Sequence, residues 1–532
     1  MSVARGNQGA VGEALGDKNY FQKRTSESKL RGEVFTPEWL ADAIVARCAS
    51  QLCGVVVDPA CGDGVFLLAV LRARLANPAL KHLGARGLYG FDIEPGNVEK
   101  ARVRLMEALK DAGVESPVEV DVGDALGEIE ARDGVLGQLK RRTGAFAAGI
   151  DLVIGNPPYV EAKRLSKEEK ARLKRIYPDA GNGPVDLCVY FASAFLGQLS
   201  KNGKLAFILP NKLLVARYAD RLRRKLVEEA RLQEVLFLSH LPVFARTAVY
   251  PVVLLAGNTQ NPRTSSLICH RPPTQDALIA GQTHPVEVPH ALYAGTQTCA
   301  IFPFPLVKSE QVLLSRLCQG PRISDVLEFR WTISFHVAGL RDRYVFDHTP
   351  ESPHAMRFIG GGRFAGNAEI QRYRTQWAGS WIDYDEERAR ADHNQLPPSS
   401  LFQRPKIAIC QNALRLRAAW DEQGFALKDT FILGIPKQGE HPLCQHPEAI
   451  VALLNADLVH SFYSQVFHGG HVGGGYLHFL APYMEDIPLG RWTIEQAQAA
   501  AGLVRALMVC EDDEQARELD HQVQRIIAEV LL

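Results

Sequence analysis

In the first half of the chain, short apolar runs that end in glycine or polar residues alternate with segments of helical periodicity. VVVDPACGDG at 55–64 predicts a strand and a glycine loop, and the following VFLLAVLRARLA has the apolar spacing of a helix. LYGFDIEP at 88–95, VEVDVGDAL at 118–126 and DLVIGNPPY at 151–159 repeat the pattern of a strand followed by a turn. Later strands are expected in KLAFILP (204–210), VLFLS (235–239) and AVYPVVLLAG (248–257). This alternation predicts an α/β fold with a doubly wound, Rossmann-like sheet.

One polar residue stands at the end of each of the first four strands. Asp58, Asp92, Asp124 and Asn156 follow one another at intervals of 32 to 34 residues, which matches the length of a βαβ unit. Ligands of doubly wound sheets bind at the carboxyl ends of the strands, so we expect these four side chains to meet in one site.

The glycine loop DPACGDG (58–64) differs from the common phosphate-binding loops. It lacks the Gly-Lys-Ser/Thr of a P-loop and the strict GxGxxG of a dinucleotide fold. Gly62 and Gly64 would still let the backbone approach a ligand at a helix N-terminus, with a plain structural turn as the alternative. Asp92 suits a contact with two ribose hydroxyls, and Asp124 could accept a hydrogen bond from an adenine amine. The set indicates an adenosine compound that is held without a phosphate-binding lysine.

The segment DLVIGNPPYV (151–160) ends its strand abruptly. Leu152 to Ile154 is an apolar run typical of a buried parallel strand, and the two prolines stop it because they have no N–H for the ladder. The amide of Asn156, two fixed carbonyls and the ring of Tyr159 are therefore presented together at the carboxyl end. A plain proline turn is the alternative interpretation.

Six motifs in the first half resemble those of one enzyme family, in the order in which that family carries them. They are VFTP (34–37), DPACGDG (58–64), FDIEP (91–95), GDAL (123–126), NPPY (156–159) and VDLCVYF (185–191). The set is similar to the amino-methyltransferases that use S-adenosylmethionine, specifically the gamma-order, TaqI-type DNA adenine-N6 methyltransferases. The resemblance covers about residues 30 to 260 and implies that S-adenosyl-L-methionine is the cofactor.

The resemblance also implies a role for each motif in holding the cofactor. Val34 and Thr36 would border its methionine and adenosine parts, and the glycine loop would lie along the methionine end. Asp92 would hold the ribose hydroxyls, Asp124 the adenine amine, and Phe191 would pack on the adenine ring. The implied cofactor-binding residues are Val34, Thr36, Asp58, Ala60, Cys61, Gly62, Asp92, Ile93, Asp124, Asn156 and Phe191.

NPPY suits methyl transfer to an exocyclic amine, which is a poor nucleophile because its lone pair is delocalised into the ring. Two acceptors aimed at its N–H groups, the Asn156 side-chain oxygen and the Pro157 carbonyl, would favour a tetrahedral nitrogen. We expect a direct, in-line transfer to a base that has left the duplex, with Tyr159 stacked on it. Phe244, where the family carries a stacking phenylalanine, would cover the other face, and a core anchor is the alternative for this residue.

Composition narrows the class of protein. The 532 residues are 46% apolar and 23% charged, so the chain can bury large cores and form two or three globular domains. The formal net charge is zero and gives no sign of a polyanionic partner. Ten scattered cysteines without a CxxC pair indicate reduced thiols and a cytoplasmic protein, and the absence of a Pro-Cys dipeptide disfavours a covalent cytosine-C5 mechanism. The sequence shows no signal peptide or membrane-spanning run, and its histidines indicate no metal site.

Changes in composition and in apolar periodicity along the chain predict five regions. We expect a flexible leader at 1–28, the methyltransferase domain at 29–260, a linker at 261–300, a mixed α/β DNA-recognition domain at 301–490 and C-terminal helices at 491–532. The fourth region loosely resembles the TaqI-type specificity domain. Its candidate DNA contacts, for which core aromatics and surface arginines are the alternative, are Trp377, Trp381, Arg404, Lys406, Arg415 and Arg417. The basic residues of 163–175, among them Arg172, suit either DNA phosphates or a solvated helix face.

The expected partner is double-stranded DNA, with no membrane association and with a separate restriction endonuclease whose cutting the methylation would prevent. We expect a monomer, because two visits by one molecule can methylate a palindromic site. The length of the chain and the residue pattern of its C-terminal half also resemble the XhoI-type modification enzymes. This resemblance implies CTCGAG as the target sequence. The alternatives are a cytosine-N4 methyltransferase, a protein-glutamine N5 or RNA amino-methyltransferase, and a DNA-binding specificity subunit with an inactive pocket.

Overall fold

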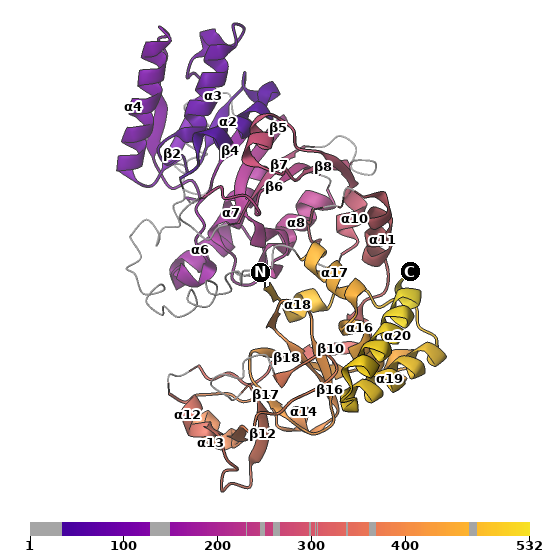
Figure 1. The fold of residues 1–532 in the computed structure, drawn as a ribbon. Helices are drawn as coiled ribbons and strands as arrows, with labels where there is room; N and C mark the ends of the chain where they lie inside the picture. The colour runs from indigo at the N-terminus through magenta and orange to yellow at the C-terminus, as the bar shows by residue number, and fades with distance from the viewer. Residues whose placement is uncertain are drawn as a thin grey trace, which may run out of the picture.

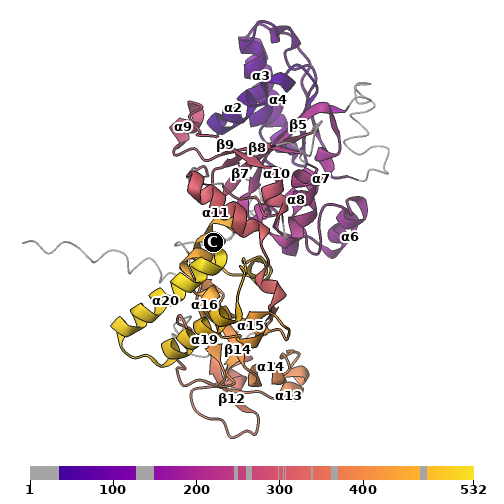
Figure 2. The same ribbon diagram turned by 90° about the vertical axis from the view of Figure 1, so that its right-hand side faces the viewer.

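The computed structural model describes residues 35–127, 149–229, 231–244, 250–258, 266–296, 299–303, 305, 307–336, 339–360, 369–467 and 476–532. One part of the molecule, from the first described residue to about residue 296, is built on a single large sheet. A second part, which contains smaller sheets and the C-terminal helices, lies below it in Figures 1 and 2. The expected leader at 1–28, together with Val34, lies outside the described residues.

The large sheet has nine strands in the order β3-β2-β1-β4-β5-β7-β6-β8-β9. The run from β3 to β5 is parallel throughout, and β7 lies antiparallel between β5 and β6. The strands are β1 (Val56–Asp58), β2 (Leu88–Asp92), β3 (Glu119–Val122), β4 (Ile150–Gly155), β5 (Leu199–Pro210), β6 (Leu232–Phe237), β7 (Pro251–Gly257), β8 (Ser266–His270) and β9 (Val286–Pro289). The chain reverses its strand order after β3, which creates the crevice expected for a ligand site.

Helices cover both faces of this sheet, because its strands are apolar on both sides. Val56, Leu152 and Ile154 belong to one buried cluster with residues of α2, α3 and α4. Val57 and Val153, which point the other way, belong to a second cluster with residues of α7 and α8. The helices of this part are α2 (Glu38–Ala46), α3 (Val65–Ala76), α4 (Pro95–Asp111), α6 (Lys167–Ile176), α7 (Leu187–Leu196), α8 (Asp220–Val227), α9 (Gln275–Ile279) and α10 (His290–Ala294). The predicted doubly wound α/β fold is confirmed.

The linker predicted at 261–300 is wrong for its described residues. The chain there forms β8 (Ser266–His270), which pairs in parallel with β6, and then α9, β9 and α10. Leu267, Cys269 and Val288 are buried and extend the core, whereas Pro272, Pro273 and Pro285 fall in the turns between these short elements. We therefore place the end of the sheet-bearing part after α10.

The second part of the chain combines small sheets with helices. A four-stranded sheet has the order β10-β18-β14-β16, and a second one has the order β11-β13-β12-β17. The C-terminal helices α19 and α20 pack on each other and on α16. Its elements, preceded by α11 (Lys308–Gln319), are β10 (Leu327–Arg330), α12 (Arg341–Tyr344), β11 (Val345–Phe346), β12 (Ala355–Ile359), β13 (Trp381–Asp383), α13 (Glu386–Ala391), α14 (Ser400–Gln403), β14 (Lys406–Cys410), β15 (Asn412–Ala413), β16 (Ala418–Asp421), β17 (Ala426–Leu427), β18 (Phe431–Pro436), α15 (Pro442–Gln445), α16 (Ala449–Leu454), α17 (Asp457–Val466), β19 (Leu477–His478), α18 (Ala481–Met484), α19 (Ile494–Val509) and α20 (Asp513–Leu531).

Within the described ranges, none of the helices combines the length and the apolar character needed to cross a bilayer. The two long C-terminal helices, α19 and α20, each have one polar face.

A partly buried ionic network ties α2 to the far strands of the large sheet. Glu234 on β6 pairs with Arg47, which follows α2, and with His270 Nε2 on β8 at 3.0 Å. The His270 Nδ1 atom lies 2.6 Å from the Thr283 hydroxyl. Burial acts to raise the pKa of Glu234, but the hydrogen bond with His270 and the charge of Arg47 outweigh it and hold that pKa below its ordinary value.

We expect Glu234→Gln to weaken the fold at neutral pH by about 1 to 3 kcal/mol and to flatten its acid dependence. Because the folded-state pKa is lowered, the stabilisation by ionised Glu234 is present above its unfolded pKa near 4.5 and is lost as the pH falls through the folded value. Urea unfolding midpoints between pH 7 and pH 3 measure the effect. Glu99→Gln, on the exposed side of α4, is the control. Parallel pH curves for the Glu234 variant and the parent would contradict this assignment.

Candidate functional site

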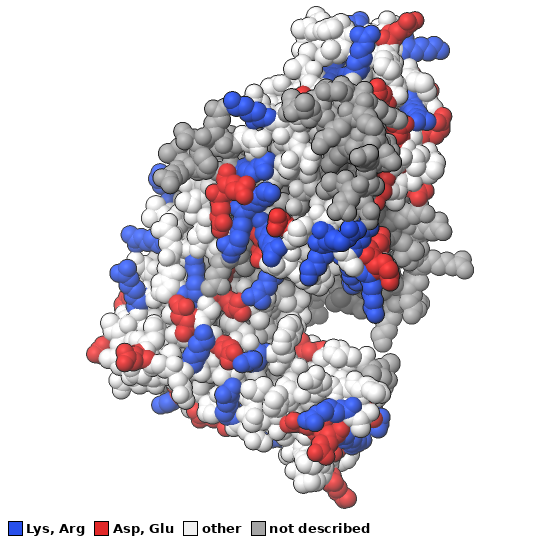
Figure 3. Space-filling view, turned by 180° about the vertical axis from the view of Figure 1, so that it is seen from behind, with Lys and Arg blue, Asp and Glu red and all other residues white. Residues whose placement is uncertain are grey.

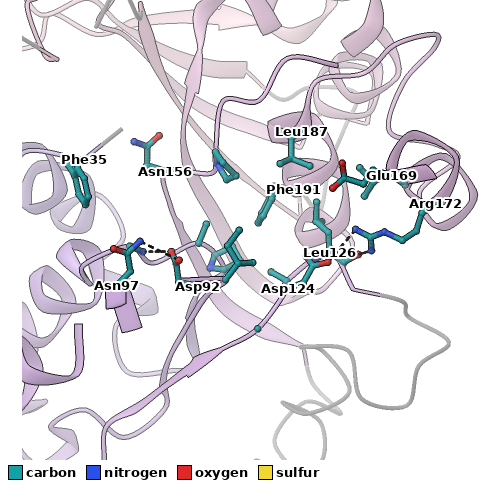
Figure 4. Close-up of a pocket in the computed structure, with 18 residues that line it drawn as sticks. Phe35, Asp92, Asn97, Asp124, Leu126, Asn156, Glu169, Arg172, Leu187 and Phe191 are labelled. Atoms are coloured by element: carbon teal, nitrogen blue, oxygen red, sulfur yellow. Dashed lines mark hydrogen bonds and ion pairs between the residues drawn. The ribbon is translucent and has the colours of Figure 1, made fainter. Parts of the chain in front are cut away.

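A cavity of about 300 Å³ opens at the carboxyl ends of β1 to β4 (Figure 4). Its walls come from the loops that follow these strands and from α6 and α7. The segments that form the walls are therefore spread over more than 150 residues of sequence, from Phe35 to Phe191. The lining residues are Phe35, Pro59, Ala60, Gly62, Asp92, Ile93, Asn97, Gly123, Asp124, Ala125, Leu126, Asn156, Pro158, Glu169, Arg172, Leu173, Leu187 and Phe191. The structure therefore brings together residues from all six predicted motifs, with Phe35 as the contribution of 34–37.

The glycine loop after β1 forms one edge of the cavity. Gly62 has a φ of +53° and its N–H donates to Asp92 Oδ2 at 2.9 Å. A Cβ added there would meet nothing within 4 Å, so the backbone is open toward the cavity. Gly64 has a φ of +81°, and a Cβ added to it would lie 2.8 Å from the Cβ of Ala101. Gly62 thus exposes backbone to a ligand, whereas Gly64 permits close packing of α3 on α4.

Asp92 at the end of β2 is held by hydrogen bonds to both of its oxygens. Besides the bond from Gly62, its Oδ1 accepts from the Glu94 N–H at 2.9 Å and from Asn97 Nδ2 at 3.4 Å. Ile93, the next residue, is 60% exposed and lines the cavity. The carboxylate is oriented before any ligand arrives, which reduces the cost of ordering it on binding.

Asp58 and Cys61 lie beneath the cavity and are absent from its described lining. The Asp58 carboxyl accepts from the Ala60 N–H at 3.2 Å, and a Cβ on Gly155 would lie 2.6 Å from Asp58 Oδ1. Burial raises the pKa of Asp58 well above its usual value, and the charges of Asp92 and Asp63 add to this. Burial likewise raises the pKa of the Cys61 thiol. Both groups support the loop from below, since Pro59, Ala60 and Gly62 are the residues that face the cavity.

Asn156 after β4 reaches the cavity and is oriented by Thr36. Asn156 Nδ2 donates to Thr36 Oγ1 at 3.2 Å, across 120 residues of sequence. Because the Asn156 amide nitrogen is the donor of this bond, the bond sets the orientation of the side-chain amide group. Pro158 lines the cavity, whereas Pro157 is buried and does not. Thr36 thus stands behind Asn156 and is not itself a lining residue.

Tyr159 and Phe244, the expected aromatic contacts, do not line this cavity. Tyr159 is half-buried, and its hydroxyl has no hydrogen-bond partner among the described residues. Burial raises the pKa of this hydroxyl well above its usual value. The ring packs on the cluster that contains α7, whereas Phe244 packs on the opposite cluster, and the two described rings make no contact.

Asp124 closes the far end of the cavity together with Arg172, whose sequence context predicted a contact with DNA phosphates or a solvated helix face. Asp124 Oδ1 accepts from the Leu126 N–H at 2.9 Å, and Oδ2 pairs with Arg172 Nη2 at 3.2 Å. Arg172 Nη1 also donates to the Leu126 carbonyl at 2.9 Å. In Figure 4 this group lies on the far side of Phe191 from Asp92 and Asn97.

Three other lining residues, Asn97, Glu169 and Leu173, lie outside the six motifs, whereas Phe35 and Leu187 belong to motifs but had no predicted role. Leu173 follows Arg172 on α6 and is 1% exposed, and Leu187 begins α7. The one usable signal in the sequence was the helical spacing of Glu169, Arg172 and Leu173, which places them on one face. That spacing does not say what the face will meet.

The cavity suits an adenosine compound. Carboxylates stand at two points, Asp92 and Asp124, and apolar side chains such as Ile93, Leu126 and Phe191 lie between them. Among the described lining residues Arg172 is the one cation, and it is already paired with Asp124. Ribose hydroxyls and an adenine amine, which can donate, fit these carboxylate acceptors better than a phosphate does, because a phosphate would be repelled by their negative charges.

Several expected DNA contacts in the second part of the chain prove to be structural. Lys406 is fully buried and paired with Asp421, so its assignment as a phosphate contact is wrong. Arg415 pairs with Asp457, and Trp377 packs edge-on against Trp381 with centroids 5.2 Å apart. Lys406 and Arg415 meet carboxylates from other elements, and Trp377 packs on an aromatic ring four residues away, so these side chains serve the local structure. Arg404 stays exposed, and Trp331, which follows β10, is 88% exposed.

Basic side chains are concentrated on the outer side of α6. Figure 3 shows Lys and Arg, mixed with Asp and Glu, at the height of α6 beside the indentation between the two parts of the molecule. The exposed basic residues of this segment are Lys163, Arg164, Lys167, Lys174 and Arg175. Arg172 points the other way, into the cavity.

Two family models match this chain. Residues 86–244 match the Eco57I restriction-modification methylase, and residues 364–489 match the TaqI-like C-terminal specificity domain. The second match falls within the region in which the TaqI-type resemblance was expected.

Curated relatives agree with these matches, and a solved structure shares the fold. The chain is 28% identical to the type II methyltransferase M.BanIII of Aneurinibacillus aneurinilyticus over 41% of its length and 37% of the relative's. It is 26% identical to the type II methyltransferase M.XhoI of Xanthomonas vasicola, over 37% and 36% of the two chains. It therefore spans little more than a third of the length of these relatives. The type IIL restriction-modification enzyme MmeI, solved in complex with DNA, shares the fold with a TM-score of 0.56 at 14% identity, covering 93% of this chain and 72% of that one.

Proposed function

Because this chain carries a restriction-modification methylase region and a TaqI-like specificity region, as its motifs predicted, we propose that it is a site-specific DNA methyltransferase. The reaction would transfer the methyl group of S-adenosyl-L-methionine to the N6 amine of an adenine in double-stranded DNA. One observation carries the proposal: Asn156, Asp92 and Asp124 line a single cavity at the carboxyl edge of the sheet.

The residues of the cavity divide naturally among the parts of the cofactor. Asp92 would accept hydrogen bonds from the ribose hydroxyls, and Asp124 would accept one from the adenine amine. Ile93 and Phe191 would lie against the adenine ring. Gly62 and Ala60, with the open backbone of their loop, would face the methionine end, supported from below by Asp58 and Cys61.

Asn156, which also lines the cavity and is one of the implied cofactor-binding residues, would act chiefly on the base. Its side-chain oxygen and the Pro157 carbonyl would accept hydrogen bonds from the target amine and localise its lone pair. The Thr36 hydroxyl holds the amide in the orientation that this requires. The cofactor supplies an electrophilic methyl group; the new N–C bond would form as the S–C bond breaks, and the nitrogen would then release a proton.

The target base would have to leave the duplex to reach Asn156. We assign Tyr159 and Phe244 to its two faces, outside the cofactor cavity that neither of them lines. The basic outer side of α6 and the exposed Trp331 are proposed to contact the DNA on either side.

We propose further that the protein is a cytoplasmic monomer that works beside a separate restriction endonuclease. The similarity to XhoI-type enzymes makes CTCGAG the first target sequence to test. The TaqI-like specificity region favours DNA over RNA or a protein glutamine as the substrate.

The function is tested by incubating the purified protein with tritiated S-adenosylmethionine and plasmid DNA, followed by digestion to nucleosides. Label in N6-methyladenine is the expected result, and mapping it gives the target site. Label in N4-methylcytosine would show that the target base is cytosine and would leave the proposed mechanism unchanged. Label in RNA or protein but not in DNA would overturn the proposal.

Asp92→Ala is expected to raise the dissociation constant for S-adenosylhomocysteine roughly 10- to 100-fold, since hydrogen bonds to a charged group are lost. Calorimetric titration without DNA measures it. Asp63→Ala is the control, because Asp63 lies in the same loop but pairs with Arg104 at 2.7 Å and is not among the lining residues. An Asp92 variant that binds within twofold of the parent would remove this residue from the cofactor site.

A further inference from the structure

Helix α6 stands at the end of the cavity where the adenine edge of the cofactor would lie. It begins with a capping box in which Ser166 and Glu169 satisfy each other's backbone N–H groups. Leu173 anchors it in the main core, and beyond its end Tyr177 packs on Tyr190 of α7 with ring centroids 6.3 Å apart. These contacts fix the position of α6, so that a side chain on its inner face can have a defined orientation in the cavity.

Arg172 is the α6 side chain that reaches into the cavity. One nitrogen of its guanidinium pairs with Asp124 and the other donates to the Leu126 carbonyl, at 3.2 and 2.9 Å. Both partners lie in the loop after β3, so the planar guanidinium bridges two points of one loop. The Arg172 side chain is 29% exposed and that of Asp124 is 49% exposed.

We propose that Arg172 is a positioning and specificity residue for the adenine end of S-adenosylmethionine, an inference that rests on the function proposed above. By holding one carboxylate oxygen of Asp124, it aims the other side of that group at the adenine amine. Because it lies beside the carboxylate that would accept from the amine, it would also obstruct a substituent on N6 of the cofactor's adenine. Arg172 does not touch DNA in this role, in contrast to its basic neighbours on the outer side of α6.

The spacing along α6 provides a matched control. Lys174 is two residues further, on the opposite side of the helix, and is exposed. The same helix therefore offers one cation directed at the cavity and one directed at solvent.

The test uses the full-length protein and two non-reactive probes, S-adenosylhomocysteine and its N6-benzyl derivative, in calorimetric titrations without DNA. Arg172→Ala should weaken binding of S-adenosylhomocysteine roughly three- to tenfold, because the lost ion pair is partly solvated. The same variant should bind the N6-benzyl derivative at least as well as the unsubstituted compound, whereas the parent should reject it. Lys174→Ala should match the parent with both compounds and should weaken only DNA binding, measured by fluorescence anisotropy.

Selectivity between the two probes separates positioning from mere support of the helix, since a loosened α6 would weaken both probes alike. Arg172→Lys should restore part of the rejection of the benzyl compound, because its long side chain again fills space beside Asp124 and its ammonium can pair with that carboxylate. Unchanged selectivity in Arg172→Ala, or a loss of DNA affinity with cofactor binding intact, would overturn the inference while leaving the proposed function standing. Failure of the parent itself to bind S-adenosylhomocysteine would overturn both.

Discussion

Asn156→Ala is expected to lower the rate of methyl transfer by about 10²- to 10³-fold, the size of effect seen when a preorganised polar group is removed from a reacting centre. The amide acts on the target amine, so its loss should appear in the turnover rate. Affinity for S-adenosylhomocysteine should stay within a few-fold, because Asp92 and Asp124 remain in place. Single-turnover transfer of labelled methyl to DNA, beside calorimetric titration of the product cofactor, measures both quantities.

The control for Asn156→Ala is Asn182→Ala, which removes an exposed amide that bonds to Asp220 and does not line the cavity. It should leave both the rate and the affinity unchanged. A parental rate in Asn156→Ala would refute the role assigned to this residue. Equal losses of rate and of cofactor affinity would instead show that Asn156 acts mainly by binding the cofactor.

Lys406→Met is expected to reduce the free energy of unfolding of the C-terminal part by about 3 to 5 kcal/mol, because it leaves the carboxylate of Asp421 buried without a counter-charge. The two residues face each other on β14 and β16, and both side chains are 0% exposed. Burial lowers the pKa of Lys406, although the charge of Asp421 opposes this shift. Asp421 also accepts from the Gln423 and Phe425 N–H groups, at 2.7 and 3.1 Å.

Urea unfolding of the full chain, followed by tryptophan fluorescence, measures the loss. Lys308→Met, at an exposed position in α11, should change stability by no more than about 0.5 kcal/mol. The double variant Lys406→Met, Asp421→Leu should recover part of the loss, and only part, because two N–H groups then lack their acceptor. A Lys406 variant as stable as the Lys308 variant would show that the pair is not what holds these strands together.

The position of the cavity could be predicted because it follows from local pattern. Apolar runs that end in Asp92, Asp124 and Asn156 recur at a constant interval, and parallel strands bring their carboxyl ends to one edge. The prolines after Asn156 stop a strand whatever surrounds it. Each of these signals is contained in a few consecutive residues.

Contacts between distant segments were beyond the reach of such patterns. Arg172 reads as one more surface cation in a basic helix, and only the meeting of α6 with the loop after β3 turns it toward Asp124. Lys406 reads as a DNA contact until β16 places Asp421 opposite it. The segment 266–294 reads as a linker because its strands are short, and it becomes the edge of the sheet by pairing with β6.

The sequence by itself thus determined the α/β class, the edge of the sheet that holds the site and the chemical type of its side chains. The tertiary structure decided which residues of the motifs face the cavity, as with Gly62 rather than Asp58. It also decided which charged side chains pair with one another inside the protein, as Lys406 does with Asp421. The physical reason is that strand and helix periodicity and chain-stopping residues act over a few positions. The partner of a charged or polar side chain is set instead by long-range packing, which brings together residues such as Asn156 and Thr36.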